Sequence, residues 1–346
     1  MPFLILLLAA FRLALPGYHY EFPRDHFNHP EFQTEWWYYT GNVHDAAGHR
    51  YGFELVFFRH GEGRASGGGA SAWRVDDLYV AHFAITDIDA RRFRYVHRIN
   101  RAGPGIAGVS GESGRIWNGN WQALWDTRSN AQTLSAMAEG MRVELRLTPQ
   151  KPLVIHGEGG LSRTGAEPGQ AAYYVSFPRL AVEGTLDGVR VSGIAWMDHE
   201  WFSALLDPAQ QGWDWFSVQL ANGAELMLFQ LRRADGSTDA HSSGTYIPAA
   251  GKPVNLDRAA FRLQPLEFWT SPKTRAVYPI NWRISLPSLH WELDCAAAVR
   301  DQELVFEDRS TPAYWEGAVT YAGAVSGVGY LEMTGYSSQA RLGTLR

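Results

Sequence analysis

Cysteine, charge and long helical patterns are all scarce in this sequence, and each scarcity excludes a class of structure. The single Cys295 cannot form a disulfide within the chain, and no cysteine cluster exists to hold zinc or an iron–sulfur centre. Charged residues make up only 19%, the formal net charge is −5 and no Lys/Arg-rich run is present, so we expect no nucleic-acid partner. Only Asn255–Gln264 is a candidate for a short helix. The fold must therefore rest on packing alone.

Sequence motifs for catalysis and cofactor binding are also missing. No serine has the glycine spacing of the Gly-x-Ser-x-Gly nucleophile turn. His199-Glu200 lacks the second histidine of the zinc motif His-Glu-x-x-His, and His26 and His29 could add ligands only if the fold brings them together. The glycine-rich run at 65–71 has no following Lys-Ser/Thr and is expected to be a loop. We therefore predict no metal site and no cofactor.

Aromatic residues, in contrast, are abundant. The 346 residues include 14 Trp, 15 Tyr and 17 Phe, and 45% of the chain is hydrophobic. This composition suits broad β surfaces and large apolar cavities better than slender helical bundles, although core packing accounts for most of these side chains. Two domains of ordinary size would account for the length.

Turn signals recur at short intervals, and the segments between them have the composition of strands. Trp213–Gly236 predicts a hairpin in which Asn222-Gly223 forms a two-residue type I′ turn. Tyr38–Arg59 predicts another, with a longer turn around Asp45–Gly48. Asp187-Gly188 and Gly323–Gly327 mark further reversals. The pattern indicates an all-β, antiparallel protein.

The two predicted hairpins resemble each other, which indicates either a duplicated β unit or the general likeness of antiparallel hairpins. Each opens with paired aromatic residues and returns through Glu-Leu, at Glu54 and at Glu225, to an arginine. Two antiparallel units can remove their sheet edges by closing into barrels, and a barrel of about eight strands can hold one small apolar ligand. The architecture itself suggests a binding cavity.

The N-terminal run Pro2–Gly17 is apolar and has the length of a signal peptide. It is too short, and too interrupted by Arg12, for a membrane span, and it lacks the usual basic start. We predict an apolar leader at 1–18 and a periplasmic or secreted protein, with a cytoplasmic protein as the alternative. The predicted domains are then 19–207 and 208–346.

The segment MDHEW, at Met197–Trp201, places two carboxylates, an imidazole and an indole side by side. In a strand, Asp198 and Glu200 point to one face and His199 and Trp201 to the other, so the carboxylates and the imidazole converge only across a bulge. Two interpretations stay open. The segment is a structural polar network, or it is the polar end of an aromatic cavity that also takes in Trp213 and Trp215.

The segment Thr34–Gly41 alternates in the same way. Glu35, Trp37 and Tyr39 share one face, and Trp36 with Tyr38 and Thr40 share the other. Both faces are too aromatic for an ordinary solvent-exposed surface.

A series of blocks resembles the AttH-type lipocalin-like proteins, which belong to the same superfamily as carotenoid 1,2-hydratase (hydroxyneurosporene synthase). The blocks are Phe22–Val43, Tyr51–Arg59, Tyr173–Leu180, Met197–Trp201, Gly212–Arg232, Tyr314–Val319 and Gly327–Tyr336. The resemblance implies two tandem lipocalin-like antiparallel β-barrels, the second beginning near Trp213. It also implies an exported bacterial protein encoded beside ABC transporter components, and so a place close to a membrane surface.

The leading hypothesis is an exported protein that binds a hydrophobic small molecule, a lipid or polyene, with ABC transporter components as candidate partners. The expected ligand-binding residues are Glu35, Trp36, Trp37, Tyr39, Glu200, Trp201, Trp213 and Trp215. The alternative that the resemblance implies is a cofactor-independent lyase that adds water to a carotenoid double bond, with Asp198 as general acid and His199 orienting it or water. A related polyene-processing enzyme, such as one that cyclises a confined polyene, also stays open. Against that pattern, no acid lies between Leu226 and Arg232. A purely structural adaptor would bind no ligand.

Overall fold

The computed structural model describes residues 11–62, 76–307 and 311–337, and nearly all of its regular structure is β. The helical elements in these ranges are two single 3-10 turns, η1 (Arg24–His26) and η2 (Pro287–Leu289). No helix within the described ranges has both the length and the apolar character needed to cross a membrane. The helix considered for 255–264 is wrong. The Asp257 carboxylate accepts the N–H groups of Ala259 and Ala260, and this turn joins two strands.

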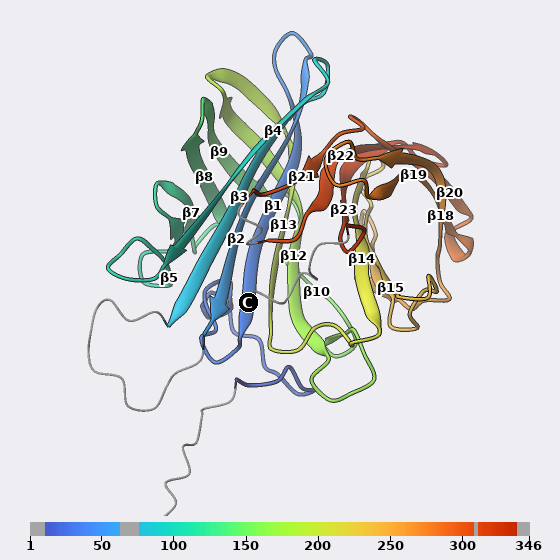
Figure 1. Cartoon of the computed structure of the whole chain (residues 1–346), viewed down its shortest axis with the longest axis horizontal. Coiled ribbons are helices and arrows are strands. Elements are labelled where there is room, and N and C mark those ends of the chain that lie inside the picture. The colour runs from blue at the N-terminus through green and yellow to red at the C-terminus, as the bar shows by residue number, and fades with distance from the viewer. Residues whose placement is uncertain (1–10, 63–75, 308–310, 338–346) are drawn as a thin grey trace, which may run out of the picture.

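The first unit is a curled antiparallel sheet in the order β4-β3-β2-β1-β13-β12-β9-β8-β7-β6-β5, with β10 and β11 paired to β12 (Figure 1). Its strands are β1 (Thr34–His44), β2 (Arg50–Gly61), β3 (Asp77–Asp87), β4 (Arg92–Arg101), β5 (Ala107–Ser110), β6 (Arg115–Asn118), β7 (Trp121–Asp126), β8 (Ala131–Ala138), β9 (Met141–Pro149), β10 (Val154–Ile155), β11 (Ser162–Arg163), β12 (Ala171–Leu186) and β13 (Val189–Phe202).

The second unit is a smaller antiparallel sheet in the order β17-β16-β15-β14-β23-β22-β20-β19-β18, with β21 paired to β22. Its strands are β14 (Gln210–Leu220), β15 (Glu225–Arg233), β16 (Ser243–Ile247), β17 (Val254–Leu256), β18 (Arg262–Thr270), β19 (Val277–Leu286), β20 (Trp291–Ala297), β21 (Glu303–Leu304), β22 (Tyr314–Gly323) and β23 (Gly327–Met333).

The two units share one strand order. In each, the first strand pairs with the last, β1 with β13 and β14 with β23, and a meander leaves from the other edge of the first strand. This common order is what a duplicated β unit predicts. The all-β, lipocalin-like prediction is confirmed, with one difference: the first unit is a nearly closed barrel and the second is a half-barrel.

The seam of the first barrel is closed by side chains around Asn118 at the end of β6. The side-chain amide of Asn118 donates to the backbone carbonyl of Tyr79 on β3 (3.0 Å) and accepts from the side chain of Asn100 on β4 (2.6 Å). The backbone carbonyl of Asn118 accepts from the Arg98 guanidinium (2.9 Å). The second sheet has no such closure, because its end strands β17 and β18 do not pair with each other in the described ranges.

The predicted hairpins are present, but one turn differs from the prediction. Between β14 and β15 the N–H of Gly223 donates to the carbonyl of Leu220 (3.0 Å), and the N–H of Leu220 donates to the carbonyl of Ala224 (2.9 Å). Of the turn residues, only Gly223 has a positive φ (80°). This is a three-residue turn with a glycine bulge, because a type I′ turn needs positive φ at both central residues. Asp187-Gly188, with φ of 50° and 81°, provides that pair between β12 and β13.

The N-terminal segment at 11–18 packs against the first unit. Tyr173 Oη donates to the carbonyl of Leu15 (2.7 Å) and accepts its N–H (2.9 Å), and the side chain of Ala14 is fully buried. The leader predicted for 1–18 therefore overlaps residues that pack on the folded body. Its first ten residues, like the glycine-rich run at 65–71, lie outside the described residues.

The interior of the first barrel is filled by side chains, and a separate apolar cluster joins the two units. At this junction a β-carbon on Gly52 of β2 would lie 2.6 Å from Tyr330 Oη and 2.9 Å from Ala318 Cβ, so only glycine fits the close approach. Gln219 of β14 donates to the carbonyls of Pro178 (2.8 Å) and Ala195 (2.9 Å) in the first unit. The outer face of β1, β2 and β13 is thereby covered by the second unit.

Candidate functional site

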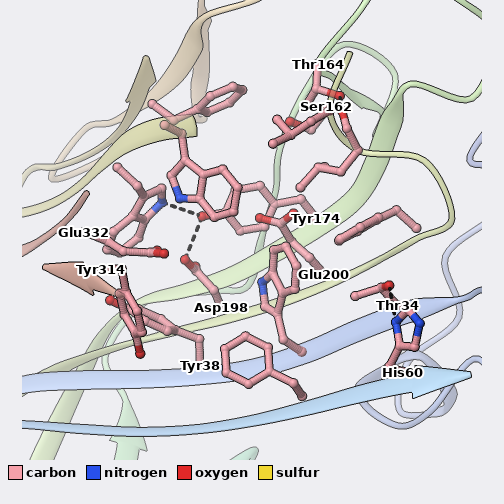
Figure 2. A pocket seen from close by; sticks show the side chains of 18 of the residues that line it. Thr34, Tyr38, His60, Ser162, Thr164, Tyr174, Asp198, Glu200, Tyr314 and Glu332 are labelled. Atoms are coloured by element: carbon pink, nitrogen blue, oxygen red, sulfur yellow. Dashed lines mark hydrogen bonds between the residues drawn. The ribbon is translucent and has the colours of Figure 1, made fainter. Parts of the chain in front are cut away.

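A cavity of about 490 Å³ lies between the two units (Figure 2). The first unit supplies one wall from β1, β2, β12 and β13, the second supplies another from β14, β15, β22 and β23, and the linking loop at 203–208 lies beside them. The lining includes the basic side chains Arg59, His60 and His82, and the aromatic, aliphatic and acidic side chains Trp36, Tyr38, Phe58, Tyr174, Asp198, Glu200, Phe202, Trp213, Trp215, Phe229, Leu231, Tyr314, Glu316 and Glu332. The wall is therefore aromatic, with acidic groups set into it.

The structure separates the residues expected at the site into two groups, as strand alternation predicted. Trp36, Asp198, Glu200, Trp213 and Trp215 line the cavity. The other group faces the first barrel's side of β1 and β13, and consists of Glu35, Trp37, Tyr39, His199 and Trp201. The second group therefore has no direct contact with a ligand in this cavity, and His199 is not placed to orient Asp198.

Asp198 is held as a hydrogen-bond acceptor. Tyr174 Oη donates to its Oδ2 (2.7 Å), and Trp196 Nε1 (2.6 Å) and Ser176 Oγ donate to its Oδ1. Trp215 of the second unit donates in turn to Tyr174 Oη (3.0 Å). Figure 2 shows the hydrogen bond between Tyr174 and Asp198. Burial raises the pKa of Asp198 to about 7, although the three donors oppose that shift.

His156 stands behind Asp198 and extends this network across the boundary between the units. Its Nε2 lies 2.7 Å from Ser176 Oγ, and its Nδ1 lies 2.8 Å from Thr245 Oγ1 on β16. Burial lowers the pKa of His156 to about 3, so its imidazole is neutral. Because Ser176 donates to Asp198, the consistent arrangement is donation from Thr245 to His156 and from His156 to Ser176. Both units thus fix the position of Asp198.

Glu200 differs from Asp198 although the two lie on the same face of β13. Within the described ranges no group forms a hydrogen bond with its carboxyl, and the side chain is directed toward the cavity (Figure 2). Burial, together with the nearby Asp198 and Glu332, raises the pKa of Glu200 well above its usual value. Burial therefore favours the protonated form of Glu200, and its carboxyl faces whatever enters the cavity.

The second unit brings more acids to the same wall. Burial raises the pKa of Glu332. Glu316 accepts from Tyr38 Oη, while Glu54 behind it accepts from Tyr314 Oη (3.2 Å). Burial raises the pKa of Glu54, with a contribution from Glu332. Burial, together with Glu54 and Glu332, raises the pKa of Glu316, so the site disfavours several charges at once.

Glu35 lies on the opposite face of β1, and its pKa is lowered rather than raised. Glu35 Oε1 accepts from His29 Nδ1 (2.7 Å) and His199 Nε2 (2.8 Å), and Oε2 accepts from Arg59 Nε (3.2 Å). Burial alone would raise the pKa of Glu35, but His29 and His199 lower it well below its usual value. Asp25 lies on the far side of His29, 3.3 Å from its Nε2. We call Asp25, His29, Glu35, Arg59 and His199 the inner network.

Three members of the inner network, His29, Glu35 and His199, also offer metal-ligand atoms within 4.8 Å of one another. Burial opposes the charged form of His29, but Glu35 and Asp25 raise its pKa to about 9, and these two carboxylates already contact both ring nitrogens. The His29 ring also lies parallel to Trp201, with centroids 4.0 Å apart, as a cation over an indole does. The cluster fits a network of ion pairs better than a metal site.

Comparison with known proteins agrees with this architecture. The AttH-like family model matches residues 13–336. The crystal structure of an AttH-type protein from Nitrosomonas europaea is 33% identical, covers 94% of this chain and 100% of its own, and superposes with a TM-score of 0.86. The chain belongs to the AttH-like family.

The AttH-like fold is shared more widely than the sequence. Kievitone hydratase from Nectria haematococca is only 16% identical, over 89% of this chain and 90% of its own, yet its TM-score is 0.66. At that identity the likeness shows the fold alone. None of the curated proteins compared with the chain matches it.

Several cavity residues of this AttH-like protein were missed by sequence reasoning. Glu316 and Glu332 are single acids inside otherwise apolar strands, and such isolated acids were a usable signal of a buried polar site. Tyr174 and His156 carried no comparable signal, because their roles depend on the pairing of β12 with β13 and on contact between the units.

Proposed function

We propose that this AttH-like protein binds a hydrophobic small molecule in the cavity between its two units. The observation that carries the proposal is the cavity itself, whose volume of about 490 Å³ lies within the range of small-molecule sites. Trp36, Trp213 and Trp215 offer ring surfaces there, and the polar lining groups include four buried carboxyls, of Asp198, Glu200, Glu316 and Glu332. A ligand gains affinity by covering these rings, and the carboxyls select its orientation.

A titration with N-phenyl-1-naphthylamine, an uncharged fluorescent probe, tests this proposal. We expect saturation at one site and a loss of affinity of about tenfold in Trp215→Ala, because the indole is a large part of the wall. Leu206→Trp, in the linking loop, fills the cavity and should abolish saturable binding. Trp117→Ala is the matched control, since Trp117 packs on Arg115 away from the cavity. Full affinity in both cavity variants would refute the site.

A second candidate function, acid-catalysed addition of water to an alkene, is favoured by the unpartnered acid Glu200. In that reaction Glu200 gives its proton to one alkene carbon, water adds to the resulting cation at the other, and the proton lost by that water returns to the Glu200 carboxylate. Indole faces stabilise the passing cation. We place the acid at Glu200 rather than Asp198, because three donors already hold Asp198 as an acceptor.

Incubation with an acyclic carotene, followed by mass spectrometry of the extracted pigment, separates the two functions. A product heavier by one water that disappears in Glu200→Gln supports the lyase. Pigment recovered unchanged leaves binding as the function. Export and a role beside an ABC transporter stay predictions from the sequence.

A further inference from the structure

Among the described residues, the cavity wall carries several acids, one arginine and the two histidines His60 and His82. Arg59 is the one Arg or Lys side chain among the described lining residues, and its guanidinium is already in use. It contacts Glu35 Oε2 (3.2 Å), Asp77 Oδ1 (2.8 Å) and the carbonyl of Phe32 (2.6 Å). Burial lowers the pKa of His60 and so disfavours its charged form. An anionic ligand would therefore find no unpaired arginine or lysine among the described lining residues.

The acids converge on the cavity from both units. Asp198 and Glu200 reach it from β13, Glu316 from β22 and Glu332 from β23. Figure 2 shows Asp198, Glu200 and Glu332 around the same space. Taking carboxyl groups out of water is unfavourable unless an opposite charge or a hydrogen-bond donor meets them, and no protein group does so for Glu200 in the described ranges.

The aromatic rings around these acids favour the same sign of ligand charge. Trp36, Trp213 and Trp215 line the cavity together with Tyr38 and Tyr174. The face of an aromatic ring carries negative potential and attracts cations, and aromatic cages with carboxylates are the usual receptors for ammonium groups. Rings and acids thus make one electrostatic environment, complementary to a positive charge.

We propose that the hydrophobic ligand of this cavity carries a cationic nitrogen, which sits between the indole faces and the carboxyls of Glu200 and Glu332. The inference rests on the proposed binding function and specifies its ligand class. The apolar part of the ligand covers the rings, and the cation supplies the partner that Glu200 lacks. A cation favours the carboxylate form of Glu200, so its binding releases the proton that burial holds there, whereas a neutral ligand brings no charge and an anion opposes that ionisation.

Displacement of N-phenyl-1-naphthylamine by three probes of equal chain length tests the ligand charge. The probes are octyltrimethylammonium, 1-octanol and octanoate. We expect the cation to bind about tenfold tighter than the alcohol, and octanoate to bind weakest. In the double variant Glu200→Gln/Glu332→Gln the ratio of cation to alcohol affinity should fall about tenfold, because the amides keep the shape and remove the acids.

The control is Glu183→Gln, which changes an exposed acid on β12 and should leave that ratio as in the wild type. Single variants Glu200→Gln and Glu332→Gln serve if the double variant does not fold. Probe binding with no preference for the cation, or a preference that survives loss of both acids, overturns this inference alone. Failure of the uncharged fluorescent probe to bind at all overturns the binding function with it.

Discussion

The two faces of the strand pair β1 and β13 carry acids in opposite states. Toward the first barrel, Glu35 is paired with His29, His199 and Arg59, and its pKa lies far below the usual value. Toward the cavity, burial raises the pKa of Asp198 and Glu200. Burial is common to both faces, so the charge state of each acid is decided by the groups that contact its carboxyl.

The comparison separates structural acids from acids that a ligand can use. The inner network satisfies each of its charges with a protein group, so it holds the segment before β1 onto the barrel. Glu200 lies one residue along β13 from His199, yet its carboxyl has no partner in the described ranges. An unpaired carboxyl in the cavity wall lowers the stability of the fold, but it can bind a ligand.

Trp201→Ala should give the largest effect on the inner face. The indole is fully buried and stacks on His29, so its removal leaves a cavity and an exposed cation, at a cost of about 3–5 kcal/mol in the free energy of unfolding. Urea unfolding measures this loss. Trp215→Ala on the cavity face should cost clearly less stability, because that indole already borders open space. Equal losses in the two variants would break the distinction between the faces.

Glu35→Gln should come next, with a loss of about 3 kcal/mol in the free energy of unfolding. The amide keeps the shape but removes the buried carboxylate that His29 and Arg59 share, which leaves Asp25 as the partner of His29 and Asp77 as the partner of Arg59. Chemical unfolding at pH 7 gives the value, and Glu183→Gln, at an exposed site, should change it by less than about 0.5 kcal/mol. A Glu35→Gln protein as stable as that control would show that the inner network does not hold the barrel.

The pH dependence of the free energy of unfolding should distinguish the cavity acids from the acids of the inner network. Because the folded protein raises the pKa of Asp198 from 3.8 to about 7, its stabilising contribution is full below about pH 4 and is lost as the pH rises to 7. Asp25 and Glu35, whose pKa values are lowered, lose their stabilising contributions only in more acidic solution. His29, whose pKa is raised, loses its contribution only as the pH approaches 9.

Asp198→Asn should therefore reduce the fall in unfolding free energy between pH 5 and pH 7 by about 2 kcal/mol. Groups facing Asp198 are Tyr174 and Ser176 on β12, Trp196 on β13 and the more distant Glu332 on β23. Urea unfolding at both pH values tests this. A fall of the same size in the variant and the wild type would mean that Asp198 does not titrate in this window.

Glu200→Gln should have the smallest effect on stability, within about 0.5 kcal/mol at pH 5. It is the same substitution as Glu35→Gln on the same strand pair, but it breaks no hydrogen bond in the described ranges. A loss comparable with that of Glu35→Gln would reveal a structural role for Glu200 and remove the difference between the two faces.

The sequence predicted the fold and the division of the strand faces, and it missed how the units meet. Period-two alternation was enough to place Asp198 and Glu200 opposite His199 and Trp201, because it depends only on local geometry. The location of the cavity was not predictable in this way. Closing barrels suggested a ligand inside one of them, yet side chains fill the interior of the first, and the cavity lies between the units.

The protonation state of each acid could not be predicted from the local sequence pattern either. Glu35 and Glu200 look alike in sequence, each beside a tryptophan. The pKa of Glu35 is lowered by His29 and by His199, which reaches it from β13, whereas burial, Asp198 and Glu332 of the other unit raise that of Glu200. The contacts of His199 and Glu332 join residues far apart in the chain, and pairing across the sheet or between the units creates them.

The most direct test of a binding site between the units is a crystal structure of the protein grown with 1-bromooctane, with the bromine located by its anomalous scattering. We expect a bromine peak between Trp215 and Glu200, in the cavity bounded by β13 and β14. A peak inside the first barrel, or on the outer surface alone, would contradict the account.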